Sequence, residues 1–266
     1  MKRPLDAIAS NLRDARTFGA SFLLRHLPFA RRDGRYRWTM PGIGPVSIRP
    51  GTTDVEVFRQ IFRAREYDLS GMRQYSAILT RYEQLLSQDK RPVIIDAGAN
   101  VGAASLWFAR AFPLATVIAV EPEPANAACC RANCAGHDRI VVREAAIGSR
   151  PGRITLDNPA RKAWSVRSRR SEAEEGVSVV TIPELVADVA DGALFIAKID
   201  IEGFESDLFA ANLDWIDAVK VMLVEIHDWM LPGQGSSLAL QRAMGERGFE
   251  ILISGENLIY INPMGE

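Results

Sequence analysis

Residues 93–109 read VIIDAGANVGAASLWFA, and this stretch changes from an apolar run to an amphipathic pattern at its centre. The apolar run predicts a buried strand, and the apolar residues after Gly102 recur with helical spacing. In an open sheet of parallel strands, ligands bind where the chain turns from a strand into a helix. The turn from Asp96 to Gly102 is therefore predicted to form part of a binding site.

Short apolar runs alternate with helical patterns along the rest of the chain. We predict strands at residues 93–96, 116–120, 140–142, 194–200, 219–226, 249–253 and 258–261. This alternation predicts a doubly wound α/β domain with a mostly parallel sheet. Only SerGlyGluAsn separates the last two runs, which is too short for a parallel crossover, so we predict an antiparallel hairpin there.

Changes in pattern divide the chain into three predicted segments: a basic amphipathic helix at 1–36, a lead-in subdomain at 37–90 and the α/β domain at 91–266. The balance of 32 basic and 33 acidic residues does not favour nucleic acid as a partner. Three cysteines, Cys129, Cys130 and Cys134, lie in one predicted helix without zinc or redox spacing. They predict buried small side chains in a reducing compartment.

The N-terminal segment has a basic character of its own. Residues 1–37 contain nine basic and three acidic residues, a net charge of +6, and apolar residues recur there with helical spacing. Such a helix packs on its own domain, on a second subunit in a homo-oligomer, or on lipid headgroups at a membrane surface. Because no run is long enough to span a bilayer and no secretory signal is present, we expect a cytoplasmic protein, with the inner face of the membrane as the alternative.

The turn after residue 96 does not match a dinucleotide site. Such a site needs the pattern G-x-G-x-x-G, so that a pyrophosphate rests on the helix N-terminus. Counted from Gly98, the two later glycine positions fall on Asn100 and Ala103. Asp96, expected at the mouth of the turn, would repel a pyrophosphate and suit a ligand with an amino group.

A second acid follows the next predicted strand. Glu121 ends the run IAVEP, where a carboxylate would accept hydrogen bonds from both hydroxyls of a ribose. Asp96 ends the first predicted strand, Glu121 follows the second, and the chain ends in a predicted antiparallel hairpin. Together these features indicate S-adenosyl-L-methionine as the ligand.

Four motifs resemble those of the FkbM family of S-adenosylmethionine-dependent methyltransferases: DAGANVG at 96–102, VEP at 120–122, KIDIEGFE at 198–205 and EIH at 225–227. The resemblance covers roughly residues 46–262 and implies a Rossmann-like class I methyltransferase fold with a seven-stranded sheet. It also implies O-methylation of hydroxyl groups on sugars, glycolipids, polysaccharides or related natural products. One departure is ThrIleProGluLeu at 181–185, where the family more often has Thr-Leu-Asp.

The resemblance also implies which residues contact the cofactor. Asp96, Gly98, Asn100 and Gly102 would line its methionine end, with Ala99 between them. Glu121, followed by Pro122, would hold the ribose. Ala145 and Ala146, after the third strand, would face the adenine.

The KIDIEG and EIH motifs supply side chains that could act as a general base on a sugar hydroxyl. A sugar hydroxyl attacks a methyl group only when a base removes its proton, which contributes about 10²- to 10⁴-fold in rate. Lys198 and Asp200 lie two residues apart on one face of a strand, and Glu225 and His227 do so on the next. We predict Asp200 as the base and His227 as its orienting partner, with Lys198, Glu202 and Glu225 shaping the acceptor site.

Three alternatives remain open for these side chains. Lys198 and Glu225 would form a buried ion pair that only stabilises the sheet. His227 would have a purely structural role with its hydrogen bonds satisfied. Asp200, Glu225 and His227 would instead hold a divalent cation that binds the acceptor hydroxyls.

A basic run at residues 148–170 carries seven basic residues and one acidic residue. It is either a solvated face or a surface that attracts an anionic acceptor, with Trp164 as a platform for a sugar ring. We therefore expect a sugar-containing or glycolipid acceptor, anionic if this run lies at the site. The alternative function is a catalytically inactive cofactor-binding or scaffold protein in a glycan biosynthetic assembly.

Overall fold

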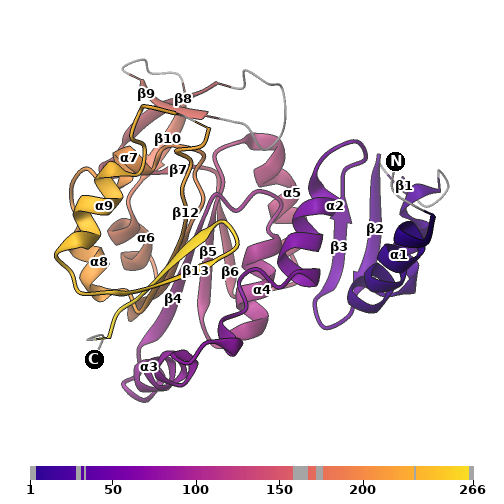
Figure 1. Ribbon diagram of the computed structural model, residues 1–266, viewed down its shortest axis with the longest axis horizontal. Coiled ribbons are helices and arrows are strands. Elements are labelled where there is room, and N and C mark those ends of the chain that lie inside the picture. The colour runs from indigo at the N-terminus through magenta and orange to yellow at the C-terminus, as the bar shows by residue number, and fades with distance from the viewer. Residues whose placement is uncertain are drawn as a thin grey trace.

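The computed structural model describes residues 4–27, 31–32, 34–157, 167–171, 176–230 and 232–263. A seven-stranded sheet runs through the centre of the molecule, and a small three-stranded sheet with helix α1 lies at one end (Figure 1). Among the described helices, none is both long and apolar enough to cross a membrane.

The central sheet contains all seven predicted strands. They are β4 (Arg91–Ala97), β5 (Thr116–Val120), β6 (Ile140–Arg143), β11 (Gly192–Ile199), β12 (Val221–Glu225), β13 (Glu250–Ser254) and β14 (Asn257–Ile261). Their order is β13-β14-β12-β11-β4-β5-β6. Strand β14 runs antiparallel to both of its neighbours, and the other pairs in the sheet are parallel. The predicted hairpin is confirmed, and this topology is the class I methyltransferase-like α/β fold.

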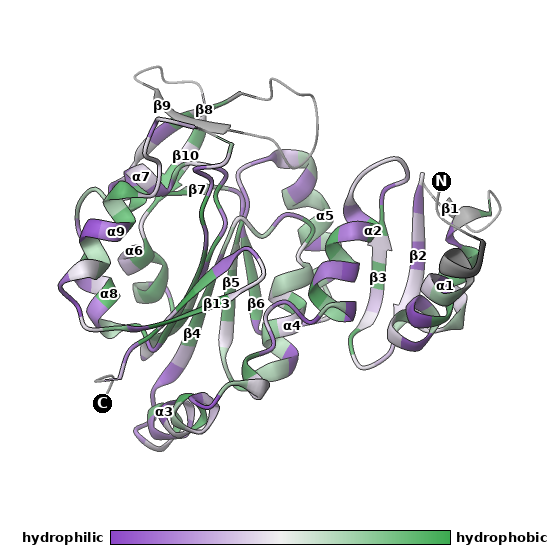
Figure 2. Ribbon diagram, in the orientation of Figure 1, coloured by the Kyte–Doolittle hydropathy of each residue, from purple (hydrophilic) through white to green (hydrophobic). Residues whose placement is uncertain are grey.

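Helices cover both faces of the sheet because its strands are apolar on both sides, and its middle is mainly green in Figure 2. One face packs against α3 (Tyr75–Ser87), α4 (Ala103–Ala111) and α5 (Pro124–Cys134). The other packs against α6 (Ile182–Ala187), α7 (Glu205–Leu208), α8 (Asp214–Ala218) and α9 (Leu238–Gly245). A capping box begins α6, in which Thr181 and Glu184 each bind the other's backbone N–H, and Pro183 lies in its first turn. Residues 181–185, which depart from the family pattern, therefore form a well-capped N-terminus of α6.

The N-terminal segment packs on the rest of its own chain. Helix α1 (Pro4–Phe18) ends at Gly19, and a 3-10 helix, η1 (Ala20–His26), follows. The buried carboxylate of Asp14 forms ion pairs with Arg25, Arg59 and Arg63. Phe18 and Phe22 are buried in an aromatic cluster with the small sheet, formed by β1 (Arg31–Arg32), β2 (Arg35–Met40) and β3 (Gly44–Ile48).

Two expectations for this segment are wrong. The helical pattern was expected to continue through Phe22, but Gly19 adopts a φ of +85° and ends the helix. Leu12, one of the apolar residues that recur with helical spacing in this segment and were expected to pack with Phe18, is 61% exposed, whereas the polar residue Asp14 is buried.

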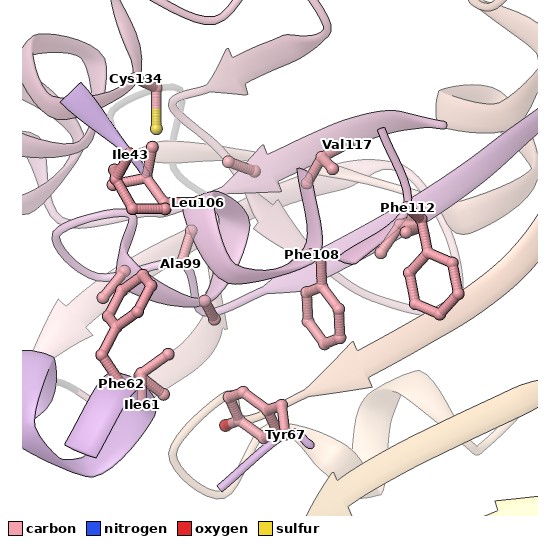
Figure 3. Close-up of a cluster of buried hydrophobic side chains, with 14 of the residues drawn as sticks. Ile43, Ile61, Phe62, Tyr67, Ala99, Leu106, Phe108, Phe112, Val117 and Cys134 are labelled. Carbon is pink, nitrogen blue, oxygen red and sulfur yellow. The ribbon is translucent and has the colours of Figure 1, made fainter. Parts of the chain in front are cut away.

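The lead-in segment shares one core with the α/β domain. It contains the short helix α2 (Asp54–Phe58), a π-helical turn, η3 (Arg59–Arg63), and a 3-10 turn, η4 (Leu69–Gly71). Figure 3 shows Ile61, Phe62 and Tyr67 beside Ala99 and Phe108 of the first strand-to-helix unit. The rings of Tyr67 and Phe108 stack with centroids 5.6 Å apart. The lead-in segment is therefore fixed against the joint predicted to bind a ligand.

A second small sheet was not predicted. It consists of β7 (Ala146–Ile147), β8 (Gly152–Asp157), β9 (Arg167–Ser171) and β10 (Val177–Val180), in the order β7-β10-β8-β9. Part of the basic run at 148–170 thus forms an antiparallel pair instead of a loop. Trp164, Arg161 and Lys162 lie outside the described residues. Arg150 and Arg153 are exposed and line neither of the two cavities described below.

Candidate active site

The joint after β4 is held close to two neighbouring strands. The backbone N–H groups of Gly98 and Ala99 both donate to the carbonyl of Val120, at 2.9 and 3.0 Å. A Cβ atom on Gly98 would lie 1.7 Å from the carbonyl oxygen of Asp200. Glycine is required here because the ends of two strands meet with no room for a side chain.

Gly102 is required for a different contact. Its φ is +84°, and a Cβ atom there would lie 2.9 Å from Sγ of Cys134 and 3.0 Å from Sγ of Cys130. The three cysteines are free and buried, as predicted. The close packing of the α4 start on α5 therefore explains Gly102.

One cavity opens at the carboxyl ends of β4 and β5, and we name it the Glu121 cavity. It is open to solvent, and its walls include the apolar side chains of Val120, Ala146, Ile147 and Phe204. Both carboxylate oxygens of Glu121 accept backbone hydrogen bonds, from Asn100 at 2.8 Å and from Glu123 at 3.0 Å. Burial raises the pKa of Glu121 to about 7, although these bonds oppose the shift.

A second cavity adjoins the first, and we name it the His227 cavity. Its walls contain five carboxyl groups and two cationic groups: Glu66, Asp200, Glu202, Glu225 and Glu256, with Lys198 and His227. Gly98, Asn100, Asp200 and Glu202 line both cavities. The two spaces therefore meet at a wall that carries two carboxylates.

Lys198 is buried between two acids. Its Nζ lies 3.2 Å from Oδ1 of Asp96 and 3.4 Å from Oδ2 of Asp200, and it donates to the carbonyl oxygens of Ala97 and Gly98. Burial lowers the pKa of Lys198, but the charges of Asp96 and Asp200 outweigh burial and raise it well above its ordinary value. The parallel register pairs Lys198 with Asp96 across β11 and β4, which explains the contact.

His227 lies at the centre of four carboxylates. Its Nδ1 is 2.8 Å from Oε1 of Glu205, which is also buried. Its Nε2 faces oxygens of Asp200, Glu225 and Glu202, at 3.6, 3.7 and 3.8 Å. The imidazole therefore faces the cavity with one nitrogen while its other nitrogen is held from behind.

These charges shift one another's pKa values. Burial lowers the pKa of His227, but the hydrogen bond and charge of Glu205, with the charges of Asp200 and Glu202, raise it to about 9. Burial and the charge of Asp200 raise the pKa of Glu202 to about 8 and that of Glu225 to about 7. At neutral pH the cluster therefore contains an imidazolium and carboxyl groups that are partly protonated.

Three of these groups also lie close enough to share a cation. One ligand atom each from Asp200, Glu202 and His227 lies within 4.8 Å of the other two. The metal-binding set that the sequence suggested as an alternative was Asp200, Glu225 and His227, so the structure has Glu202 where Glu225 was expected. Glu202 joins the group because it follows Asp200 in a tight turn, with φ of +55°.

Comparison with known protein families identifies the family of this chain. The family model described as the methyltransferase FkbM domain matches residues 96–251, more than half of the chain. The chain belongs to the FkbM methyltransferase family. It is therefore an S-adenosylmethionine-dependent methyltransferase.

Similar proteins include other methyltransferases. The 2-O-methyltransferase NoeI of Sinorhizobium fredii (strain NBRC 101917 / NGR234) is 28% identical over 187 residues, covering 62% of this chain and 76% of NoeI. The crystal structure of methyltransferase FkbM from Methylobacillus flagellatus KT is 16% identical, with a TM-score of 0.42, and the match covers 65% of this chain and 44% of that one. A methyltransferase structure from Geobacter sulfurreducens is 16% identical, with a TM-score of 0.36, and the match covers 80% and 92% of the two chains.

The structure places most of the predicted cofactor residues of this FkbM family member around the Glu121 cavity. Gly98, Asn100, Glu121, Pro122, Ala145 and Ala146 line it, and Ala99 lines the His227 cavity. Asp96 and Gly102 are not among the described residues that line the Glu121 cavity or the His227 cavity. Asp96 was expected at the mouth of the turn, which is wrong: it is fully buried, and the ammonium group that it faces belongs to Lys198.

All five predicted catalytic residues of the methyltransferase line the His227 cavity. The alternative in which Lys198 pairs with Glu225 is wrong, because Lys198 is bound by Asp96 and Asp200. Sequence reasoning did not single out Glu205, although it ends the quoted KIDIEGFE motif. It also missed Glu66 and Trp229, which come from the lead-in segment and from the residues after the EIH motif.

Proposed function

We propose that this methyltransferase transfers a methyl group to a hydroxyl of a sugar, in a glycolipid, a polysaccharide or a related natural product. The observation that carries the proposal is the shared wall of the two cavities, where the carboxylates of Asp200 and Glu202 face both spaces. A base at that position would reach a hydroxyl in one cavity while the methyl donor occupies the other. The similarity to a 2-O-methyltransferase supports an oxygen acceptor.

The Glu121 cavity is proposed as the site of S-adenosylmethionine. Its apolar walls would suit an adenine ring, which would pack against Ala145 and Ala146. The fixed carboxylate of Glu121 suits the ribose hydroxyls, while Gly98 and Asn100 would line the methionine end. When bound, the cofactor supplies an electrophilic methyl group on a sulfonium.

Asp200 is proposed as the base that takes the proton of the accepting hydroxyl. Its two oxygens lie near opposite cations, with Lys198 at 3.4 Å and Nε2 of His227 at 3.6 Å. These contacts orient the carboxylate toward the shared wall. The imidazolium of His227 is the orienting group, since its raised pKa keeps the proton on the ring at neutral pH. Glu202 and Glu225 would accept or donate hydrogen bonds to neighbouring hydroxyls.

The charge of the His227 cavity bears on the acceptor. With five carboxyl groups and two cations in its walls, the cavity repels an anionic group beside the reacting hydroxyl. We therefore propose that the sugar unit that enters this cavity is not itself anionic. The side chain of Trp229, 65% exposed at the wall, would stack on its apolar face.

A second candidate mechanism uses a divalent cation. Asp200, Glu202 and His227 would hold it, because two carboxylates and one imidazole are an acceptable set for Mg²⁺ or Mn²⁺. Glu205 behind Nδ1 would then orient the histidine, as carboxylates commonly do for metal-bound histidines. Methyl transfer that survives EDTA unchanged would exclude this mechanism.

The test is incubation of the protein with labelled S-adenosylmethionine and glycan or lipid extracts, followed by identification of the methylated product. Asp200→Asn should bind the cofactor normally by calorimetry and transfer methyl at least about 100-fold more slowly. Asp138→Asn, an exposed change distant from both cavities, is the matched control. Unchanged turnover in Asp200→Asn would remove this residue from the mechanism. Failure of every hydroxyl-bearing extract to accept label would favour the non-catalytic scaffold.

A further inference from the structure

A third hollow lies between α1, the lead-in segment and α4. Its floor is apolar, with Met40, Phe62 and Trp107, and its rim carries Arg16, Arg65 and Arg110. We name it the arginine pocket. Its parts come from α1, from the end of β2, from η3 and the residues after it, and from α4, so tertiary packing and not local sequence assembles it.

The charge of the arginine pocket is not balanced. Arg65 forms an ion pair with Asp68, with Nη2 2.5 Å from Oδ2. The guanidinium groups of Arg16 and Arg110 form no ion pair or hydrogen bond with any residue that the structure describes. Three guanidinium groups thus face one hollow with one carboxylate in its wall. Arginine binds phosphate oxygens through two N–H donors at once, which makes a phosphate the ligand that best matches this set.

Exposed leucines are concentrated in the N-terminal segment that also carries Arg16. Leu12 lies one helical turn before Arg16 on the same face of α1 and is 61% exposed. Leu23, Leu24 and Leu27 follow in and after η1 and are also exposed. Of the nine exposed large apolar residues in the described chain, four lie between residues 12 and 27. Basic residues beside exposed leucines are typical of a helix that lies in a lipid headgroup layer.

The helix that carries these residues is fixed in place. On its other side, Asp14 binds three arginines and Phe18 packs in the aromatic cluster. Arg16 and Leu12 are therefore presented on a preformed surface, and binding requires no folding step.

We propose that the arginine pocket binds the phosphate group of an anionic lipid headgroup, while Leu12, Leu23, Leu24 and Leu27 enter the headgroup layer. The pocket adjoins the His227 cavity through one segment of chain. Gln60, Glu66 and Tyr67 face that cavity, whereas Phe62, Arg65 and Asp68 face the arginine pocket. A lipid phosphate held there lies beside the acid-lined cavity and outside it.

The test is sedimentation of the full-length protein with vesicles. Vesicles containing phosphatidylglycerol should bind it, pure phosphatidylcholine vesicles should not, and added salt should weaken the binding. Arg16→Gln/Arg110→Gln should lower the affinity about tenfold or more, since each basic residue near an anionic surface contributes appreciably. The matched control is Arg131→Gln/Arg143→Gln, which removes two exposed arginines elsewhere that pair with Glu144 and Asp188.

Two outcomes would overturn the proposal. One is an equal loss of vesicle binding in the test and control variants, which would indicate a general charge effect. The other is absence of vesicle binding, whether or not calorimetry shows that free glycerol 3-phosphate binds. Both variants should unfold at the wild-type temperature, because the four arginines are exposed. Neither outcome bears on methyl transfer, which is assayed separately.

Discussion

Nδ1 of His227 lies 2.8 Å from Oε1 of Glu205, and both side chains are almost completely buried. The contact joins the start of α7, which follows β11, to the loop after β12, at the carboxyl edge of the sheet. It fixes the ring so that Nε2 faces the cavity shared with Asp200. The proton on His227 is therefore controlled by a residue that does not line the cavity itself.

Replacing Glu205 by Gln should make stability depend less on pH. The pKa of His227 is raised from 6.5 to about 9, so the stabilisation is fully present below about pH 6.5 and is lost as the pH rises through about 9. Glu205→Gln retains an acceptor but removes the charge. It should lower the free energy of unfolding by about 3 kcal/mol at pH 6 and by much less at pH 10.

Urea unfolding at the two pH values would measure this difference, and NMR titration of His227 would show its pKa moving downward. Glu246→Gln, at an exposed position after α9, is the control. An equal loss of stability at pH 6 and pH 10 would show that Glu205 acts by packing and not through the proton on His227.

Replacing Trp229 by Ala should weaken acceptor binding and leave chemistry almost unchanged. Trp229 lines the His227 cavity, but among the described residues the ion-pair contacts of Nε2 of His227 do not involve it. Loss of a stacking surface should raise KM for the acceptor about fivefold to tenfold, with kcat within about twofold. Trp229→Phe should restore most of the affinity. Steady-state kinetics with the identified acceptor would check this, and Leu238→Ala, another exposed apolar residue outside the cavity, provides the comparison.

The central sheet was predictable because its strands are buried on both faces. Such strands read as continuous apolar runs, as in VIID at 93–96 and VMLVE at 221–225, so both position and type follow from composition. The pair β8 and β9 gave no such signal, because Arg167, Arg169 and Arg170 make β9 read as a solvated loop. Its pairing with β8 is set by register and not by hydrophobic pattern.

The sequence predicted which charged residues gather at the edge of the sheet, but not which of them form ion pairs. Acids and bases at strand ends were correctly expected at one edge, since parallel strands end together. The partner of Lys198 was not found, because periodicity says which residues share a face but not which strand is adjacent. The sheet order places β4 beside β11, and only then does Asp96 become the neighbour. Glu66 and Trp229 reach the cavity through tertiary packing that no local pattern records.

Replacing Gly98 by Ala should disrupt the joint between β4 and α4. Its Cβ would overlap the carbonyl oxygen of Asp200, and φ at Gly98 is +76°, so both space and backbone oppose the change. We expect a loss of about 3 kcal/mol or more in stability, together with loss of cofactor binding. Gly136→Ala is the matched control, because nothing lies within 4 Å of its Cβ position. Thermal unfolding and calorimetry would measure both effects. Two variants of equal stability would mean that the strand ends separate easily.

Replacing Lys198 by Met should destabilise the fold, because the carboxylates of Asp96 and Asp200 would lose the ammonium group between them. Asp96 would be left buried beside Ser105 alone, and Asp200 would lose one of its two cations. Breaking a buried pair on one side costs about 3–5 kcal/mol, whereas removing both partners costs much less. Urea unfolding of Lys198→Met, Asp96→Asn and the double variant forms a double-mutant cycle. We expect the double variant to be more stable than Lys198→Met. Additive losses would show instead that Lys198 stabilises the fold mainly through its hydrogen bonds to the carbonyl oxygens of Ala97 and Gly98, with its charge contributing little.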